Sequence, residues 1–305
     1  MKIAYLTDCD SIGGGMEYIH RQAAAHSGDE ICMFFSSRGE CTPARMDEWN
    51  ADVIHVNHLK ALAQLFRNPF RRPSGKVVFT VHGIHLRKYD FLPKTLVNRF
   101  KRLARRALES WLYRKCDRLI ALTETDAADI QRIYNPRVPI SIEPNTIDSA
   151  ELVLEPRGLC YKPDEFAFVC IARFDFQKGQ DVLLKAISSA QVSLRSRSAR
   201  TLMIGDGPEL VKARNFSAKH GITDLVEFAG AIPHAGAYMT CAKVLVAPSR
   251  WEGMPYLLLE AVARMRPIVA SDCPGNRDVL KGYANARLFP VEDIAALARL
   301  MAETA

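Results

Sequence analysis

The sequence has no apolar run that approaches the roughly 20 residues needed to span a bilayer. It has no low-complexity tract and no short-period repeat. The N-terminal residues reach Asp8 and Asp10 too soon for a signal peptide and are typical of a first buried strand. Together with a content of 48% apolar and 25% charged residues, these absences predict a soluble, cytoplasmic, globular protein.

Signals for metals and disulfides are also scarce. The eight cysteines show no C-x-x-C spacing, and several lie within strand-like runs, so buried free thiols explain them better than disulfides or zinc. The histidines lack glutamate or cysteine partners at metal-ligand spacing, and we therefore expect no metal site. The cysteines are Cys9, Cys32, Cys41, Cys116, Cys160, Cys170, Cys241 and Cys273.

Short apolar strands alternate with amphipathic helices along the chain, which predicts parallel sheets covered by helices on both faces. The pattern restarts after Asp148, so we predict two doubly wound α/β domains, 1–148 and 149–305. Ligands are then expected at the carboxyl ends of the strands, in a cleft between the domains. The expected strands are Lys2–Leu6, Glu30–Phe35, Val53–Val56, Lys76–Val81, Arg118–Leu122, Ile140–Ile142, Phe166–Ile171, Thr201–Ile204, Val226–Phe228, Val244–Ala247 and Ile268–Ala270.

Two glutamates, Glu252 and Glu260, stand with seven residues between them. A Gly-Met-Pro turn follows the first, and an apolar run that predicts a helix contains the second, about two turns in, with Pro255 in the first helical turn. The unpaired amides and the dipole at such a helix start favour a phosphate. Because carboxylates bind paired hydroxyls, the combination indicates a nucleotide-sugar pocket. For the spacing alone, an ordinary strand–helix unit with surface glutamates is the simpler interpretation.

Two later loops offer further groups. Arg173 and Lys178 follow a predicted strand, where a guanidinium fork and an ammonium can neutralise one diphosphate, although an exposed basic loop is the alternative. Gly205 and Gly207 follow the next strand and predict a tight turn.

The first domain carries weaker signals. Gly14 and Gly15 precede a predicted helix and let a ligand approach the backbone, but they match neither a Walker loop nor a full G-x-G-x-x-G fingerprint, and a plain flexible turn fits as well. His82 ends a predicted strand and is followed by glycine, which suits a group that lines a cleft; a structural histidine is the alternative.

Segment 94–118 is strongly basic, with nine Lys and Arg residues against Glu109 and Asp117, and the whole chain has a net charge of +7. One interpretation is a helix packed on the sheet through an apolar stripe, with its basic face in solvent. The other is a face that rests on anionic lipid. Nucleic acid is disfavoured because no interleaved aromatics accompany the charge. The stripe consists of Leu96, Phe100, Leu103, Ala107 and Trp111.

Residues 249–255, Ser-Arg-Trp-Glu-Gly-Met-Pro, with the helix that follows and the Pro-Ile-Val-Ala-Ser-Asp strand after it, resemble the donor site of the retaining GT-B glycosyltransferases of family 4. The loops at 171–179 and 205–208 and the His-Gly pair at 82–83 resemble the same family. The resemblance implies a GT-B fold, with two Rossmann-like domains facing a central cleft. It also implies sugar transfer to a hydroxyl with retained configuration, from a UDP- or GDP-linked sugar, without a metal or other cofactor.

The resemblance also implies roles for individual residues. Glu260 would bind the ribose hydroxyls and Glu252 a hydroxyl of the sugar, Arg173 and Lys178 would hold the diphosphate, and His82 would orient or polarise the sugar. The first domain would bind a glycan or lipid-linked acceptor, in cell-surface polysaccharide or glycolipid synthesis at the cytoplasmic face of the inner membrane. Further donor-site residues would be Gly14, Gly15, Gly205, Gly207, Gly253, Met254, Pro255, Tyr256 and Leu257.

The chain departs from the family pattern in three ways. Its first half is compact, so the acceptor-binding insertions are short. Thr146 stands where the family usually has glycine, and the sequence stops at Ala305, where family members continue for several helices. We therefore expect either a short form or a truncated one. A sugar-nucleotide epimerase of related fold and a catalytically silent subunit remain alternatives, although the intact motif residues argue against the second.

Overall fold

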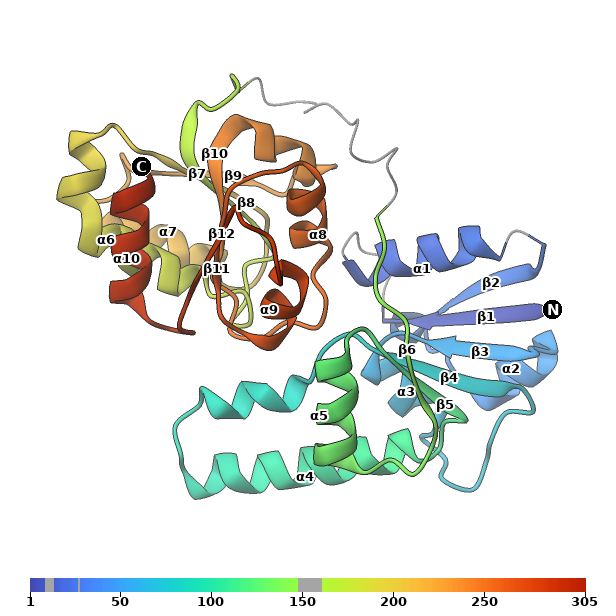
Figure 1. The fold of residues 1–305 in the computed structure, drawn as a ribbon. Coiled ribbons are helices and arrows are strands. Elements are labelled where there is room, and N and C mark those ends of the chain that lie inside the picture. Colours follow the sequence, from blue (N-terminus) through green and yellow to red (C-terminus); the bar gives the residue numbers. More distant parts are fainter. Residues whose placement is uncertain (9–13, 27, 148–160) are drawn as a thin grey trace. The chain divides into compact units, whose positions relative to one another are not determined.

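The computed structural model describes residues 1–8, 14–26, 28–147 and 161–305, and Figure 1 shows its ribbon. The chain divides into two compact units, Met1–Asn145 and Thr146–Ala305, called the N-terminal and C-terminal units below. The predicted boundary at Asp148 lies outside the described residues. Among the residues that the structure describes, no helix is long and apolar enough to cross a membrane.

The N-terminal unit is a six-stranded parallel sheet with the strand order β2-β1-β3-β4-β5-β6. Helices α2 to α5 contribute to one core beneath the sheet, while α1 covers the opposite face (Figure 1). The elements are β1 Lys2–Thr7, α1 Gly14–Ala25, β2 Glu30–Phe35, α2 Pro43–Trp49, β3 Val53–Val56, α3 Leu59–Leu65, β4 Lys76–Val81, η2 His85–Asp90, α4 Leu96–Tyr113, β5 Arg118–Ala121, α5 Glu124–Tyr134 and β6 Ile140–Ile142, with a short 3-10 turn, η1, at Ser36–Arg38.

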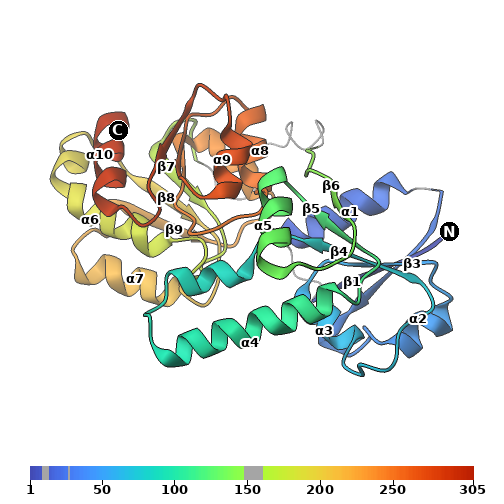
Figure 2. The same cartoon turned by 60° about the horizontal axis from the view of Figure 1, so that its bottom comes forward.

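The C-terminal unit is a second six-stranded parallel sheet with the order β9-β8-β7-β10-β11-β12. Helices α6, α7 and α10 pack on one face and α8, α9 and the 3-10 helix η4 on the other, as Figures 1 and 2 show. The elements are β7 Phe166–Ile171, α6 Gln180–Ser196, β8 Thr201–Ile204, α7 Leu210–Lys219, β9 Val226–Gly230, η4 Ala235–Cys241, β10 Ala242–Ala247, α8 Tyr256–Ala263, β11 Ile268–Ser271, α9 Pro274–Leu280, β12 Ala286–Phe289 and α10 Ile294–Thr304.

Local chemistry explains where several helices begin. The side chains of Thr95, Thr123 and Asp293 each accept a hydrogen bond from an amide in the first turn of α4, α5 and α10, which satisfies a group that the helix leaves unpaired. The central strands are buried on both faces, and their continuous apolar runs reflect this.

The predicted α/β class with two doubly wound domains is confirmed, because each unit is a Rossmann-like parallel sheet with helices on both faces. All eleven predicted strands are present, some with shifted ends, and β12 is a twelfth among the described residues that the sequence pattern missed. The described cysteines are all free thiols, as expected. Cys32 is half-buried, and the buried ones are Cys41, Cys116, Cys170, Cys241 and Cys273. Cys9 and Cys160 lie outside the described residues.

Helix α4 contradicts one expectation. The interpretation that its apolar stripe packs on the sheet is wrong for the first turns, where Leu96, Phe100 and Leu103 are exposed. The end of the stripe does pack as expected: Trp111 lies partly buried against the core beneath the sheet, next to the buried Leu112 and Tyr113.

Candidate active site

The C-terminal unit has one position where its strand order reverses direction, between the neighbouring strands β7 and β10. In parallel sheets of this type, the loops that follow the two strands at such a point lead to opposite faces and leave a crevice at the carboxyl edge. The loop after β7 contains Arg173 and Lys178, and the loop after β10 contains Glu252. The topology therefore brings these predicted residues, which are far apart in sequence, to the same edge.

Lys178 and Glu252 form an ion pair, with 2.7 Å between Lys178 Nζ and Glu252 Oε1. Ser249 Oγ donates to the same Oε1 at 2.6 Å, whereas among the described residues Oε2 receives only a long contact of 3.4 Å from Gln177 Nε2. Burial alone would lower the pKa of Lys178, but the charge of Glu252 outweighs it and the pKa is raised. Lys178 is thus a fixed positive charge, and Glu252 Oε2 is the oxygen with capacity to accept another hydrogen bond.

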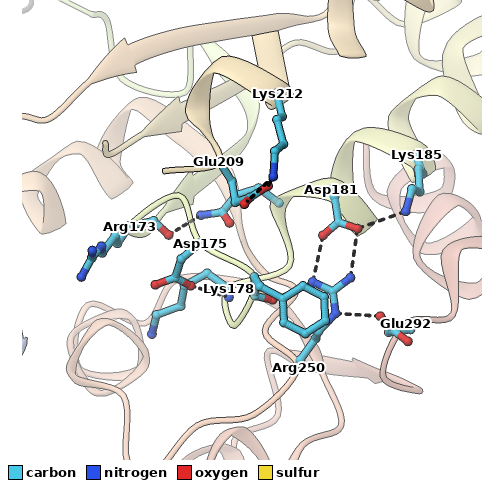
Figure 3. Close-up of polar contacts among 11 residues, drawn as sticks. Arg173, Asp175, Lys178, Asp181, Lys185, Glu209, Lys212, Arg250 and Glu292 are labelled. Carbon is cyan, nitrogen blue, oxygen red and sulfur yellow. Dashed lines mark hydrogen bonds and ion pairs between the residues drawn. The ribbon is translucent and has the colours of Figure 1, made fainter. Parts of the chain in front are cut away.

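Arg173 is placed differently. Its side chain is exposed and extends away from the loop in Figure 3, and it forms no ion pair with any described residue. Its backbone is fixed, because Gln180 Nε2 donates to the Arg173 carbonyl at 2.8 Å. The structure therefore brings Lys178 and Glu252 together and leaves the Arg173 guanidinium available at the same edge.

Arg250 is the main residue of this edge that sequence reasoning missed. Its guanidinium is 5% exposed and makes two bonds of 2.9 Å to Asp181 and one of 2.6 Å to Glu292 (Figure 3). It also donates to the Phe176 carbonyl at 2.6 Å. These bonds tie the loops after β7 and β10 to the start of α6 and to the segment before α10. Its position two residues before Glu252 was the only signal in the sequence.

Glu260 is the fifth residue of α8, so it lies just over one turn into the helix rather than the predicted two. Its carboxylate lies against η4, at a point where a Cβ on Gly236 would be 2.0 Å from Oε2. Glycine at position 236 thus leaves the space that the Glu260 side chain occupies.

The start of α8 also differs slightly from the expectation. Pro255 is the cap residue before the helix and has extended backbone, rather than a place in the first turn. Its carbonyl accepts from the amides of Leu258 and Leu259 at 3.2 and 3.3 Å. The amides of Leu258 and Leu259 are therefore already engaged, and an anion would have to bind the backbone before them, between Gly253 and Leu257. This stretch contains the predicted residues Met254, Pro255 and Tyr256.

Gly205 and Gly207 pack tightly against the loop after β7. A Cβ at Gly205 would lie 2.0 Å from the Ala172 carbonyl oxygen, and one at Gly207 would lie 2.4 Å from that of Phe174. Both residues also have positive φ, of 140° and 152°. Glycine is therefore needed at both positions because a side chain would clash with the backbone of the loop that carries Arg173.

The loop that carries Glu252 is supported from behind by α9. A Cβ at Gly275 would lie 2.0 Å from the Gly253 carbonyl oxygen. Ser271 Oγ donates to the carbonyl of Ser249, and Asn276 Nδ2 donates to the Ser271 carbonyl at 3.0 Å. The sequence gave no indication of these contacts, which fix the backbone on both sides of Glu252.

In the N-terminal unit the strand order reverses between β1 and β3, and His82 follows the next strand, β4. His82 Nε2 lies 3.4 Å from Asn57 Oδ1, and its ring packs edge-on against Tyr18 at 4.8 Å. Burial, followed by the nearby His58 and His55, lowers the pKa of His82 to about 3. The imidazole is therefore neutral near pH 7.

Two further features belong to this edge of the N-terminal unit. Asn57 is 2% exposed, and its Nδ2 donor has no hydrogen-bond partner among the described residues. Gly14 and Gly15 are the first residues of α1, while Gly13 lies outside the described residues. Within the described ranges no group of three His, Cys, Asp or Glu side chains is arranged to hold a metal ion.

His55 leads to a prediction about acid stability. It is buried on β3 with Nε2 2.7 Å from Thr80 Oγ1, and burial lowers its pKa from 6.5 to about 3. Between these values the unfolded chain binds a proton that the folded protein does not, so stability falls as the pH falls, by about 2 kcal/mol at pH 5. We expect His55→Gln to lose less stability between pH 7.5 and pH 5, measured by urea unfolding. Equal losses in both proteins would contradict this account.

Comparison with known proteins agrees with the fold. A family model described as "Glycosyl transferases group 1" matches residues 165–305, and one described as "Glycosyltransferase Family 4" matches residues 28–151. The two matches cover most of both units. The class defined by the fold is that of GT-B proteins, with two Rossmann-like units. With these matches, the chain belongs to the GT-B glycosyltransferases.

Among curated proteins, the chain is 26% identical to 2-deoxystreptamine N-acetyl-D-glucosaminyltransferase of Streptomyces fradiae, over 85% of this chain and 63% of that protein. It is 24% identical to the putative colanic acid biosynthesis glycosyltransferase WcaL of Escherichia coli, over 75% of this chain and 55% of that protein. The chain thus spans less than two thirds of the length of either relative.

Two solved structures share the fold. Sucrose-phosphate synthase from Thermosynechococcus elongatus has a TM-score of 0.77 at 19% identity and covers 99% of this chain and 91% of its own. Anabaena Alr3699/HepE, in complex with UDP and glucose, has a TM-score of 0.74 at 17% identity and covers 99% of this chain and 89% of its own. At these identities the likeness concerns the fold alone.

Proposed function

We propose that the protein transfers a sugar from a UDP- or GDP-linked donor to a hydroxyl of a glycan or lipid-linked acceptor, with retention of anomeric configuration, as in family 4. The observation that carries the proposal is the Lys178–Glu252 pair at the crevice between β7 and β10. The pair places a positive charge for a diphosphate 2.7 Å from a carboxylate for a sugar hydroxyl. The similarity to a solved relative that holds UDP and glucose supports the donor class.

The donor would lie along the carboxyl edge of the C-terminal unit. Lys178 and the exposed Arg173 would neutralise the charge that develops on the leaving diphosphate, which is the largest electrostatic requirement of the reaction. Because two cations are available there, we propose that the transfer needs no metal. Glu252 Oε2 would accept a hydrogen bond from a sugar hydroxyl, and the Glu260 carboxylate would accept hydrogen bonds from the ribose hydroxyls.

The geometry of Glu252 argues against a covalent intermediate in the proposed transfer. Its Oε1 is engaged by both Lys178 and Ser249, and the side chain is 7% exposed. A carboxylate so stabilised is a weak nucleophile. The leaving phosphate would instead take the proton of the acceptor hydroxyl on the same face of the sugar, as the resemblance to family 4 implies.

The acceptor would bind to the N-terminal unit at the edge that carries His82. The unpaired Asn57 amide donor offers a hydrogen bond to an acceptor hydroxyl, whereas the neutral imidazole of His82 would orient or polarise the donor sugar. A role in cell-surface polysaccharide or glycolipid synthesis is the proposed context, supported by the similarity to a relative described as a colanic acid biosynthesis glycosyltransferase.

Isothermal titration with UDP, GDP and other nucleoside diphosphates tests the proposal, followed by a donor-by-acceptor screen that includes lipid-linked glycans. Binding of one diphosphate and transfer to an acceptor with retained configuration support it. Release of a free epimerised sugar without transfer would favour an epimerase. No binding of any nucleoside diphosphate would favour a silent subunit and overturn the proposal.

Glu260→Gln isolates the ribose contact. We expect its Kd for the preferred nucleoside diphosphate to rise by about 10- to 100-fold, because a hydroxyl bond to a charged carboxylate becomes a bond to a neutral amide. Inorganic pyrophosphate lacks ribose and serves as the control ligand, with an unchanged Kd in the same titration. A parallel loss of affinity for both ligands would place Glu260 outside the ribose site.

A further inference from the structure

Helix α4 exposes an apolar surface where a soluble helix normally has its polar side. Leu96 is 80% exposed, Phe100 73%, Leu103 63% and Val97 61%. At 100° per residue, Leu96, Phe100 and Leu103 fall on one side of the helix. Exposed apolar groups that are contiguous in this way mark an interaction site more often than scattered ones do.

The opposite side of α4 makes polar contacts with the rest of its unit. Arg102 Nη1 lies 2.7 Å from Asp90 Oδ1 on η2, and Arg105 pairs with the buried Glu109. Tyr134 on α5 donates to the other oxygen of Glu109. The last turn of the helix is held in the core by Leu112 and Tyr113, whereas the part before it contacts its neighbours through polar groups and leaves its apolar side facing outward.

The apolar side is bordered by basic residues. Arg99 lies beside the Leu96–Phe100–Leu103 stripe, Lys101 lies one turn after Val97 on the other side of that valine, and Lys94 precedes the helix. All three are exposed, and none forms an ion pair with a described residue. These positive charges are therefore available to an external anionic partner.

A second exposed apolar group adjoins the far end of α4. Phe70 is 96% exposed and has Arg67, Arg71 and Arg72 as close sequence neighbours, all exposed. Lys115 Nζ donates to the Pro69 carbonyl at 3.3 Å, which attaches this loop to the segment just after the helix. The same combination of an apolar group and surrounding arginines thus occurs twice in one unit.

We propose that Leu96, Val97, Phe100 and Leu103, called the α4 surface below, dock on an anionic lipid bilayer. The apolar side chains would enter the acyl boundary and the basic residues would contact lipid phosphates, each strengthening the interaction roughly fivefold. The charge pattern selects this occupant. A second copy of the chain would bring the same basic border against itself, and nucleic acid would leave the apolar side chains in water.

This inference goes beyond the proposed sugar transfer and does not depend on it. None of the residues of the α4 surface belongs to the candidate active site. Membrane docking and donor binding can therefore fail separately.

Co-sedimentation with vesicles tests the proposal, using phosphatidylcholine alone and phosphatidylcholine mixed with phosphatidylglycerol. We expect binding to the mixed vesicles only, weakened by added salt. Phe100→Ser with Leu103→Ser should lower the partition coefficient by about tenfold or more, and Arg99→Glu with Lys101→Glu by a similar factor. These positions are exposed, so the unfolding midpoint should not change, which shows that the variants are folded.

Val192→Ser with Val211→Ser is the matched control, because these valines are 80% and 68% exposed on α6 and α7 of the other unit. Its binding should equal that of the wild type. Absence of wild-type binding, or equal losses in the control and the α4 variants, would overturn the proposal. A dimer in vesicle-free sedimentation that dissociates in the Phe100→Ser, Leu103→Ser variant would overturn it in favour of a second copy.

Discussion

Lys178→Ala is expected to lower the kcat of sugar transfer by about 10²- to 10³-fold, the effect typical of removing one group that stabilises transition-state charge. Lys178 is the cation fixed in the crevice between β7 and β10, and its raised pKa keeps it charged across the working range. Steady-state kinetics with the preferred donor measure the loss. Near-normal turnover in the variant would remove Lys178 from the proposed mechanism.

A second variant separates this effect from damage to Glu252, which loses its countercharge when Lys178 is replaced. If the stranded carboxylate caused the loss, Lys178→Ala combined with Glu252→Gln would recover affinity for the nucleoside diphosphate, which lacks the sugar that Glu252 is proposed to bind. We expect no recovery, because the diphosphate still lacks its cation. Lys185→Ala is the control: Lys185 is an exposed lysine that pairs with Asp181 at 3.0 Å on α6, and its removal should leave kcat unchanged.

Gly275→Ala is expected to be the most destabilising of the proposed substitutions, by about 2–3 kcal/mol. Its Cβ would lie 2.0 Å from the Gly253 carbonyl oxygen and 2.8 Å from that of Glu252, so either α9 or the Glu252 loop must move. Since the moving backbone carries Glu252, nucleoside diphosphate affinity should fall together with stability. Urea unfolding and isothermal titration measure the two effects.

The matched control is Gly28→Ala, because a Cβ there would meet no atom within 4 Å. Neither glycine has a positive φ, so a difference in stability between the two variants reports the steric clash of the added Cβ and not a strained backbone conformation. Equal stability of the two variants would show that α9 does not restrict the Glu252 loop. If Gly275→Ala were destabilised but kept its nucleotide affinity, the position of the Glu252 loop would not control nucleotide binding, which would contradict the proposed role of this loop.

Much of the fold could be predicted because parallel strands that are buried on both faces are continuous apolar runs. β7, Phe166–Ile171, is such a run, and it was predicted with its observed bounds. β12, Ala286–Phe289, was missed because Arg287 and Leu288 are exposed at the edge of the sheet, so no apolar run marks it. Helix α4 was predicted to exist, but its orientation depends on partners such as Asp90 that no periodicity reveals.

The same division holds for the site. Sequence motifs and the rule for parallel sheets were enough to place Lys178 and Glu252 at one edge, although 74 positions separate them. They were not enough to predict that the two side chains bond to each other, because that depends on loop conformation. Gly205 and Gly207 were expected near the nucleotide, but their close packing on Ala172 and Phe174 accounts for them without a ligand. Whether they also contact the donor stays a prediction.

Arg250 also limits how the length of this protein can vary. One guanidinium bonds to Phe176, Asp181 and Glu292, so an insertion in any of the three connected segments would pull at least one acceptor out of reach. The turns at Gly221 and Gly282 are different, since a Cβ at either position would meet nothing within 4 Å. Tags, labels or inserted peptides are therefore best tolerated at these turns, and worst in the loops that the arginine holds.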